Sequence, residues 1–323
     1  MLVVTGGAGF IGSNLARALA ERAGASVVVV DNLTGDLTQG PKFRNLVGVR
    51  LADYLDKDDF LDLVTRRDAL LERVEHVFHL GACSDTTAAD GSYLMRNNFE
   101  YSKRVARFCL EGRVPLVYAS SAAVYGAGRV FREAPEHERP LNVYGYSKQL
   151  FDDWVRQRLP GARSPLVGLR FFNVYGPREA HKGAMASMAY QLHEQLRATG
   201  VAPLFAGTDG YADGEQVRDF VYVDDVVAVG LWFLEHPARG GIYNVGTGRA
   251  RSFNDLAAAL IGRLGRGRIS YVPFPEALAG VYQSCTRADL SALRGAGYDG
   301  AFRSLEEGVA AYVAWLAGGS DGR

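Results

Sequence analysis

A glycine-rich stretch near the start of the chain, TGGAGFIG at residues 5–12, constrains the fold more than any other feature. It follows the apolar run LVVT (2–5), opens an amphipathic stretch over 11–22, and precedes a second run, VVVVD (27–31). Its glycines fit two spacings, G-x-x-G-x-x-G with Gly6, Gly9 and Gly12, and G-x-G-x-x-G with Gly7, Gly9 and Gly12. Between a strand and a helix, such glycines let the backbone approach a pyrophosphate at the positive end of the helix. We therefore predict a dinucleotide-binding turn, the alternative being a plain tight turn.

Apolar, strand-like runs alternate with helix-length segments through the first half of the chain. After the two runs above come VGVRLAD (47–53), HVFHLGA (76–82), PLVYASS (115–121) and PLVGLRFFNVYG (165–176). Strands that are apolar on both faces and separated by helices are typical of a parallel sheet covered by helices. We expect an α/β fold, with a Rossmann-type doubly wound parallel sheet and a smaller α/β C-terminal substrate-binding domain. The expected dinucleotide-binding domain is 1–172, with a return crossing at about 219–248, and residues 173–323 form mainly the substrate-binding domain.

The charge balance and the cysteines exclude several classes of function. The 323 residues carry 36 basic and 36 acidic side chains, so neither nucleic acid nor an anionic membrane is expected as the main partner. Cys83, Cys109 and Cys285 are scattered, which indicates a reducing compartment with no disulfide framework and no metal site. The first residues lack a basic leader and no apolar run reaches membrane-spanning length. We expect a soluble, cytoplasmic protein with a small-molecule substrate.

Asp31, at the end of the second apolar run, lies 19 residues after Gly12. An acidic residue at this place normally binds a ribose hydroxyl and favours NAD. Against that, Asn32, Lys42 and Lys57 lie downstream, where a 2′-phosphate could be paired. The residues alone leave NAD and NADP open.

The segment YGYSK (144–148) places Tyr144 and Lys148 on one face of a helix. An ammonium beside a phenol stabilises the phenolate, so the pKa of Tyr144 is expected below its usual value of about 10. Such a pair is a proton shuttle for an alcohol that is oxidised by hydride transfer. Ser121, at the end of PLVYASS, can donate a hydrogen bond to the same substrate oxygen, and Ser120 is the competing candidate.

Together these motifs resemble the extended short-chain dehydrogenase/reductase family of nucleotide-sugar enzymes. The resemblance is carried by TGGAGFIG, HLGA, YASSAAVYG, YGYSK, RFFNVYGP and RDFVYVDDV. A narrower likeness runs nearly end to end, in DNL, KFRNLV, ADYLDKDDF, GACSDTT, PLNVYGYSK, NVYGPREAHKGAMAS, YNVGTGRA, YVPFP and RGAGYD. Through these stretches the chain is similar to the ADP-L-glycero-D-manno-heptose 6-epimerases within that family.

The resemblance implies an NADP-dependent nucleotide-sugar epimerase, an isomerase that acts on ADP-heptose. Such an enzyme interconverts ADP-D-glycero-D-manno-heptose and ADP-L-glycero-D-manno-heptose by transient oxidation at C6 with tightly bound NADP, in lipopolysaccharide core precursor synthesis. It also implies a homo-oligomer, a homopentamer in the family.

Lys182, in the small-residue run HKGAMAS, is implied to be a second catalytic base. The chemistry agrees, because two epimeric alcohols present their oxygens in different directions and one base reaches both with difficulty. Burial there is expected to lower the pKa of Lys182. The alternatives are a surface lysine with no role, and His181 as the second base.

The resemblance assigns further residues to each ligand. The cofactor side comprises Gly6, Gly9, Phe10, Ile11, Gly12, Asp31, Asn32, Lys42, Lys57, Leu80, Gly81, Ala82, Cys83, Ser84, Asn97, Lys148, Val174 and Lys182. The substrate side comprises Ser121, Asn173, Ala184, Gln191, Phe205, Ala206, Gly207, Thr208, Arg218 and Tyr282. Leu80, Ala184 and Gln191 depart from the family pattern, where Glu, Ser and His are expected. The first departure touches packing of the cofactor loop, and the other two touch substrate contacts.

Two other functions fit part of the pattern. A UDP-sugar 4-epimerase of the same superfamily uses the same shuttle but has no evident use for Lys182. A nucleotide-sensing Rossmann protein without chemistry has no use for Ser121, Tyr144 and Lys148.

Overall fold

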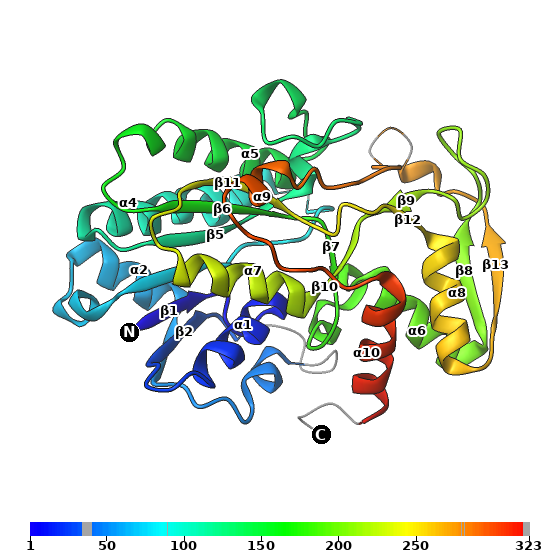
Figure 1. Ribbon diagram of the computed structural model, residues 1–323, viewed down its shortest axis with the longest axis horizontal. Helices are drawn as coiled ribbons and strands as arrows, with labels where there is room; N and C mark the ends of the chain where they lie inside the picture. Colours follow the sequence, from blue (N-terminus) through cyan, green and yellow to red (C-terminus); the bar gives the residue numbers. More distant parts are fainter. Residues whose placement is uncertain (34–40, 89, 279, 281, 319–323) are drawn as a thin grey trace.

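A seven-stranded parallel sheet forms the centre of the computed structural model, which describes residues 1–33, 41–88, 90–278, 280 and 282–318 (Figure 1). The strand order is β11-β6-β5-β4-β1-β2-β3. The strands are β1 (Leu2–Thr5), β2 (Val27–Asp31), β3 (Asp53–Asp56), β4 (His76–His79), β5 (Leu116–Ser121), β6 (Leu166–Phe171) and β11 (Gly241–Val245). The order reverses between β1 and β4, as in a doubly wound sheet. The predicted fold class is confirmed.

Helices cover both faces of this sheet because successive strand residues point to opposite sides. In β1, Val4 packs into a core with Leu15 and Phe233, whereas its neighbour Val3 packs into a second core with Phe60 and Phe151. The first core lies under α1 (Phe10–Ala20) and α7 (Val223–Glu235), which lie side by side in Figure 1. The second lies under α2 (Lys57–Arg66), α4 (Tyr101–Gly112) and α5 (Val143–Arg156). Shorter helical segments include α3 (Gly91–Leu94), a π-helical turn (Met95–Glu100) and α9 (Ser291–Gly295).

A smaller C-terminal lobe stands at the right of Figure 1. It contains α6 (Met188–Thr199), α8 (Phe253–Leu264), α10 (Leu305–Ala317) and the parallel pair β8 (Val201–Phe205) and β13 (Arg268–Val272). Leu192, Leu204, Leu256 and Leu260 form its own buried core. Two short pairs, β7 (Asn173–Tyr175) with β10 (Phe220–Tyr222) and β9 (Val217–Arg218) with β12 (Arg251–Ser252), connect the lobe to the sheet. The chain then returns through α7 to β11, which pairs with β6. The domain boundary at residue 172 stays a prediction.

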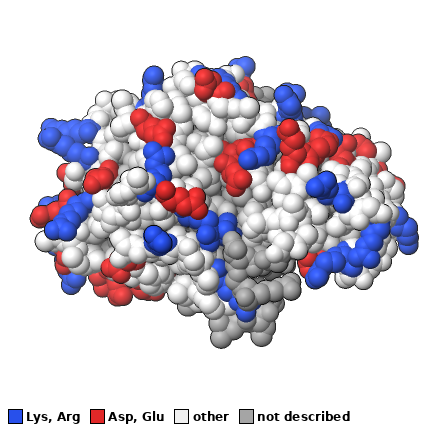
Figure 2. Space-filling view, turned by 60° about the horizontal axis from the view of Figure 1, so that its bottom comes forward, with Lys and Arg blue, Asp and Glu red and all other residues white. Residues whose placement is uncertain are grey.

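The surface agrees with the charge balance of the sequence. Figure 2 shows acidic and basic side chains interspersed over the face that it presents. Among the described residues, no helix has the length and apolar character needed to cross a membrane.

Asp219, between β9 and β10, joins three parts of the chain through one buried carboxylate. It accepts hydrogen bonds from the Thr247 amide and hydroxyl (both 2.7 Å), the Gly248 amide (2.9 Å) and the Ala288 amide (2.9 Å). The side chain is fully buried, so a donor that loses this partner has no water to replace it. The carboxylate therefore holds the C-terminal segment against the end of β11.

Replacing Asp219 by alanine is expected to destabilise the protein by about 3 kcal/mol or more, because several buried donors lose their acceptor together. The measurement is the urea unfolding midpoint, with Asp62→Ala on the exposed face of α2 as the matched control. Equal midpoints for the two variants would contradict the assignment.

Candidate active site

A cavity of about 860 Å³ lies at the C-terminal ends of β1, β4, β5 and β6 and extends to the C-terminal lobe. Its wall runs from the glycine turn, past Ser121, Tyr144 and Lys148, to Arg218 and Tyr282. Ligands of open parallel sheets bind at this edge, outside the carboxyl ends of the strands. The cavity is therefore the candidate active site.

The glycine turn is a cradle in which side chains do not fit. Gly6 has a positive φ of 68°, and a Cβ there would lie 2.6 Å from the Gly81 amide nitrogen. A Cβ on Gly12 would lie 2.1 Å from the Gly6 carbonyl oxygen. The Ala8 amide donates to Asp31 Oδ2 at 2.9 Å, which fastens the turn to the end of β2. The turn leaves backbone at the start of α1 open to a pyrophosphate, so the residues fit a dinucleotide.

A carboxylate and an ammonium meet at the end of β2. Lys42 Nζ lies 3.2 Å from Asp31 Oδ1 and 2.9 Å from Asn32 Oδ1. Lys57 Nζ donates to Asn97 Oδ1 at 3.5 Å, also on the cavity wall. Four of the five lysines in the chain line the cavity, the exception being Lys103.

Helix α5 lies against β5 in a register set by buried polar contacts. Asp152 accepts hydrogen bonds from the Tyr118 hydroxyl, the Ser120 hydroxyl and Arg170 Nε, each at 2.8 Å. One turn earlier, Lys148 Nζ donates to the Ala119 carbonyl at 2.9 Å. Because the Ser120 hydroxyl is donated to Asp152, Ser121 is the better placed of the two serines.

The Ser121 hydroxyl stands at the end of β5 beside Tyr144. Its Oγ accepts a hydrogen bond from the Ala123 amide at 3.1 Å, and its side chain is hydrogen-bonded to Tyr144. Burial raises the pKa of Tyr144, and the contact with Ser121 opposes that rise. The expectation of a lowered pKa for Tyr144 is therefore wrong for this structure. The reason is that desolvation of the buried phenolate dominates, while the Lys148 ammonium is bonded to a backbone carbonyl.

Lys148 and Lys182 are both buried amines. Burial lowers the pKa of Lys148 to about 8, and the negative charge of Asp152 opposes the decrease. Burial also lowers the pKa of Lys182, in the direction predicted from the sequence, and Glu179 opposes it. The Lys182 Nζ lies 5.6 Å from the centre of the Phe10 ring.

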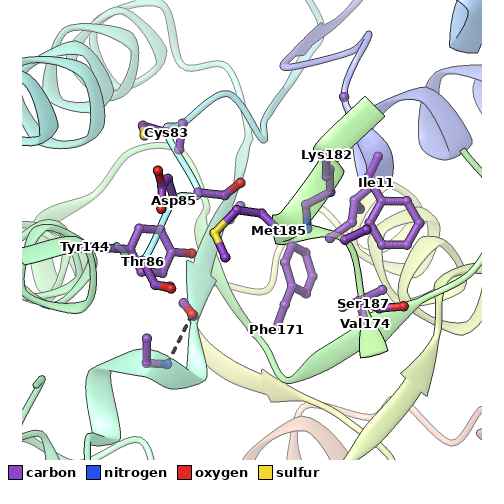
Figure 3. A pocket seen from close by; sticks show the side chains of 18 of the residues that line it. Ile11, Cys83, Asp85, Thr86, Tyr144, Phe171, Val174, Lys182, Met185 and Ser187 are labelled. Carbon is purple, nitrogen blue, oxygen red and sulfur yellow. Dashed lines mark hydrogen bonds between the residues drawn. The ribbon is translucent and has the colours of Figure 1, made fainter. Parts of the chain in front are cut away.

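Figure 3 shows Tyr144 and Lys182 on opposite sides of the cavity, with the Met185 side chain between them. Asp85 and Thr86 extend into the same space from the side of Tyr144. The cavity thus has two facing walls, and each carries groups that can exchange a proton, Tyr144 on one and Lys182 on the other.

Both histidines near the site are neutral. Burial, with Lys148 nearby, lowers the pKa of His79 to about 3, and its ring nitrogens contact Thr5 Oγ1 (2.6 Å) and Ser102 Oγ (2.8 Å). His79 is therefore a structural residue. Burial lowers the pKa of His181 to about 4, and its Nδ1 lies 3.1 Å from the Arg178 carbonyl oxygen.

The NAD dependent epimerase/dehydratase family matches residues 2–246. The chain belongs to this family. It is 58% identical over 313 residues to the ADP-L-glycero-D-manno-heptose-6-epimerase of Alkalilimnicola ehrlichii, with 97% of this chain and 96% of that protein covered. The resemblance seen in the sequence is confirmed.

Two solved structures extend the comparison. The ADP-L-glycero-D-manno-heptose-6-epimerase of Helicobacter pylori has a TM-score of 0.83 and 33% identity, covering 98% of this chain and 96% of that one. The UDP-glucose 4-epimerase of Thermotoga maritima, solved with UDP-glucose, has a TM-score of 0.80 and 28% identity, covering 98% of both chains.

In this epimerase-family enzyme, most of the predicted residues lie on the cavity wall. They are the predicted catalytic residues, all those predicted for the cofactor, and Asn173, Phe205, Arg218 and Tyr282 from the substrate side. Their individual roles stay predictions.

Five predicted substrate residues are absent from the cavity wall in the described part of the chain: Ala184, Gln191, Ala206, Gly207 and Thr208. Ala184 is exposed, and the Gln191 amide donates to the Ala184 (3.0 Å) and Ala186 (2.8 Å) carbonyls. Just after β8, the Ala206 amide donates to the Val272 carbonyl at 2.8 Å, which continues the pairing with β13. Gln191 therefore supports the Lys182 loop from outside the cavity.

The sequence analysis missed several residues of the cavity wall, among them Asp85, Thr86, Met185, Ser187 and Gln283. None belongs to a spacing pattern. The rarity of lysine was a usable signal: the chain has five lysines against 31 arginines, and four of the five lysines line this cavity. An ammonium shifts its pKa readily on burial and a guanidinium does not.

The Lys148 amine is expected to titrate at about pH 8 because it is buried. The measurement is ¹³C NMR of enzyme labelled at lysine Cε, in which five lysines limit the spectrum and Lys148→Arg identifies the resonance. A Lys148 resonance that stays in its ammonium form well above that pH would contradict the expectation.

Proposed function

We propose that this enzyme is an ADP-L-glycero-D-manno-heptose 6-epimerase, which interconverts the two C6 epimers of ADP-glycero-manno-heptose. The observation that carries the proposal is the opposition of Tyr144 and Lys182 across one cavity. Epimerisation through a planar C6 interconverts two alcohols whose oxygens point in different directions. A proton must therefore be exchanged with the oxygen in each orientation. The 58% identity with a 6-epimerase supports the choice of substrate.

NADP is the proposed cofactor, and the residues at the end of β2 support this choice. Lys42 pairs with Asp31 and Asn32 where the ribose of a dinucleotide would lie, and a cation at that point supports pairing with a 2′-phosphate. The turn at Gly6 and Gly12 would hold the pyrophosphate. When bound, the dinucleotide supplies reversible hydride transfer at C6 of the sugar. The same proposal includes a cytoplasmic homo-oligomer, a homopentamer as in the family.

Tyr144 and Lys182 divide the proton transfers between two orientations of C6. Tyr144, with Ser121 hydrogen-bonded to it, exchanges the proton of one epimer: as phenolate it accepts the hydroxyl proton during oxidation, and as phenol it returns a proton to the oxygen during reduction. Lys182 exchanges the proton of the other epimer from the facing wall. Burial lowers the pKa of Lys182, which favours the neutral amine, the form that can act as a base. Lys148, one turn after Tyr144 on α5, donates to the Ala119 carbonyl on the same cavity wall.

The nucleotide end of the substrate is proposed to lie at Arg218. Its guanidinium is buried and stacks at 4.8 Å over the Tyr282 ring and 5.4 Å over the Phe253 ring. A buried guanidinium on a cavity wall favours a diphosphate. Phe205, 6.4 Å from the Tyr282 ring centre, completes an aromatic corner suited to a nucleobase.

Tyr144→Phe or Lys182→Met is expected to reduce epimerisation of ADP-heptose by about 10²–10⁴-fold, while the bound nucleotide is retained. Lys103→Met, which replaces the one lysine outside the cavity, is the matched control and keeps wild-type activity. The assay is NMR of the two epimers, with UDP-glucose as the alternative substrate. Turnover of UDP-glucose in place of ADP-heptose, or full activity of Lys182→Met, would overturn the proposal.

Lys42→Ala is expected to weaken NADP binding much more than NAD binding. A charge-assisted hydrogen bond to the 2′-phosphate exists only with NADP and contributes about 1.5–3 kcal/mol. The measurement is the dissociation constant of each dinucleotide by calorimetry, with Lys103→Ala as the control. Equal losses for NAD and NADP would show that Lys42 does not contact the phosphate.

A further inference from the structure

The segment that carries Lys182 is a loop closed by one buried carboxylate. Glu179 is 1% exposed. Its Oε1 accepts the Gly176 amide at 3.1 Å, at the start of the loop. At the other end, Ser187 donates its hydroxyl to Oε1 at 2.8 Å and its amide to Oε2 at 2.5 Å. The carboxylate thus ties together both ends of residues 176–187.

The backbone of Lys182 is hydrogen-bonded to the backbone of Glu179. Its amide donates to the Glu179 carbonyl at 3.0 Å, which begins the helical turn Ala180–Met185. The turn then kinks at Gly183, where φ is +53°, and ends at Ser187, the N-cap of α6. With both ends fixed and its first turn anchored, the loop has one way to present Lys182 to the cavity.

The carboxylate is also the negative charge in the neighbourhood of the Lys182 amine. It opposes the effect of burial on the pKa of Lys182. Burial raises the pKa of the Glu179 carboxyl, while the donors of Ser187 and Gly176 and the nearby Lys182 ammonium oppose that rise and favour the ionised form. Tyr312 on α10 also donates to this carboxylate. Other charged or titratable groups around the loop include Arg178 within it, His181, Lys42, Tyr190 and Glu194.

We propose that Glu179 is a positioning residue, which holds Lys182 on the wall opposite Tyr144 and supplies negative charge beside its amine. This inference rests on the proposed function of Lys182 as the second proton-transfer group. Glu179 itself contacts neither sugar nor cofactor, since its carboxylate is filled by donors of the loop. Its effect therefore has two parts, one on the shape of the loop and one on the charge of the amine.

Two variants separate these parts. Glu179→Gln removes the charge and keeps the length, so the ammonium form of Lys182 is less stabilised and its titration moves to lower pH. Glu179→Asp keeps the charge but is one methylene shorter, so it does not reach both Gly176 and Ser187. Glu194→Gln is the matched control, because it removes a more exposed carboxylate on the neighbouring helix α6.

The readouts are the ¹³C titration of Lys182 in lysine-labelled enzyme and the pH profile of epimerisation. We expect Glu179→Gln to move the Lys182 titration, and the pH limb that depends on it, to lower pH while Lys148 is unchanged. Glu194→Gln moves neither. We expect Glu179→Asp to lower kcat by tenfold or more with bound nucleotide retained.

An unchanged Lys182 titration in folded Glu179→Gln, or wild-type epimerisation by Glu179→Asp, would overturn the proposal. If the glutamine variant does not fold, the aspartate variant decides. The Lys182→Met variant tests the proposed function separately. The NMR titration of Lys182 requires no turnover, so it tests the role of Glu179 independently of the reaction.

Discussion

The buried carboxylate of Asp152 is the contact on which the catalytic wall depends. It is fully buried, and it binds Tyr118 and Ser120 on β5 and Arg170 on β6. A buried charge of this kind is stable only with its partners in place, so helix α5 has one register against the sheet. Tyr144 and Lys148, two turns and one turn earlier on the same helix, are placed at the end of β5 as a consequence.

The opposite cavity wall is also held by a buried carboxylate, which lies in the loop that carries Lys182. Glu179 fixes the Lys182 loop as Asp152 fixes α5. Each carboxylate joins segments that are distant in sequence or loosely structured. Asp219 does the same for the segment that follows β11. In each case the carboxylate accepts from donors that would otherwise be buried without partners, which is costly. Buried carboxylates thus fix the segments that carry Tyr144 and Lys182.

Much of this arrangement could be predicted from the sequence. The glycine turn, the parallel sheet and the Tyr144–Lys148 pair follow from local spacing, because each depends on residues close together in the chain. Ser121 was preferred to Ser120 from the sequence, but the contact that distinguishes them involves Asp152, which lies 32 residues after Ser120. The pKa of Tyr144 was predicted in the wrong direction because burial is a property of the whole fold. Ala206, Gly207 and Thr208 were assigned to the substrate by resemblance, but of this stretch only Phe205 lines the cavity.

If C6 is oxidised transiently, the hydrogen on that carbon leaves as hydride and later returns to the same carbon. Hydride that leaves C6 inside a closed cavity returns to C6 without meeting water, whereas deprotonation of the carbon would exchange it with solvent. The decisive measurement is epimerisation of ADP-heptose that carries deuterium at C6, followed by NMR and mass spectrometry of both epimers. Transient oxidation predicts full retention of deuterium at C6 in both epimers. Loss of the label to water, with solvent hydrogen at C6, would contradict it.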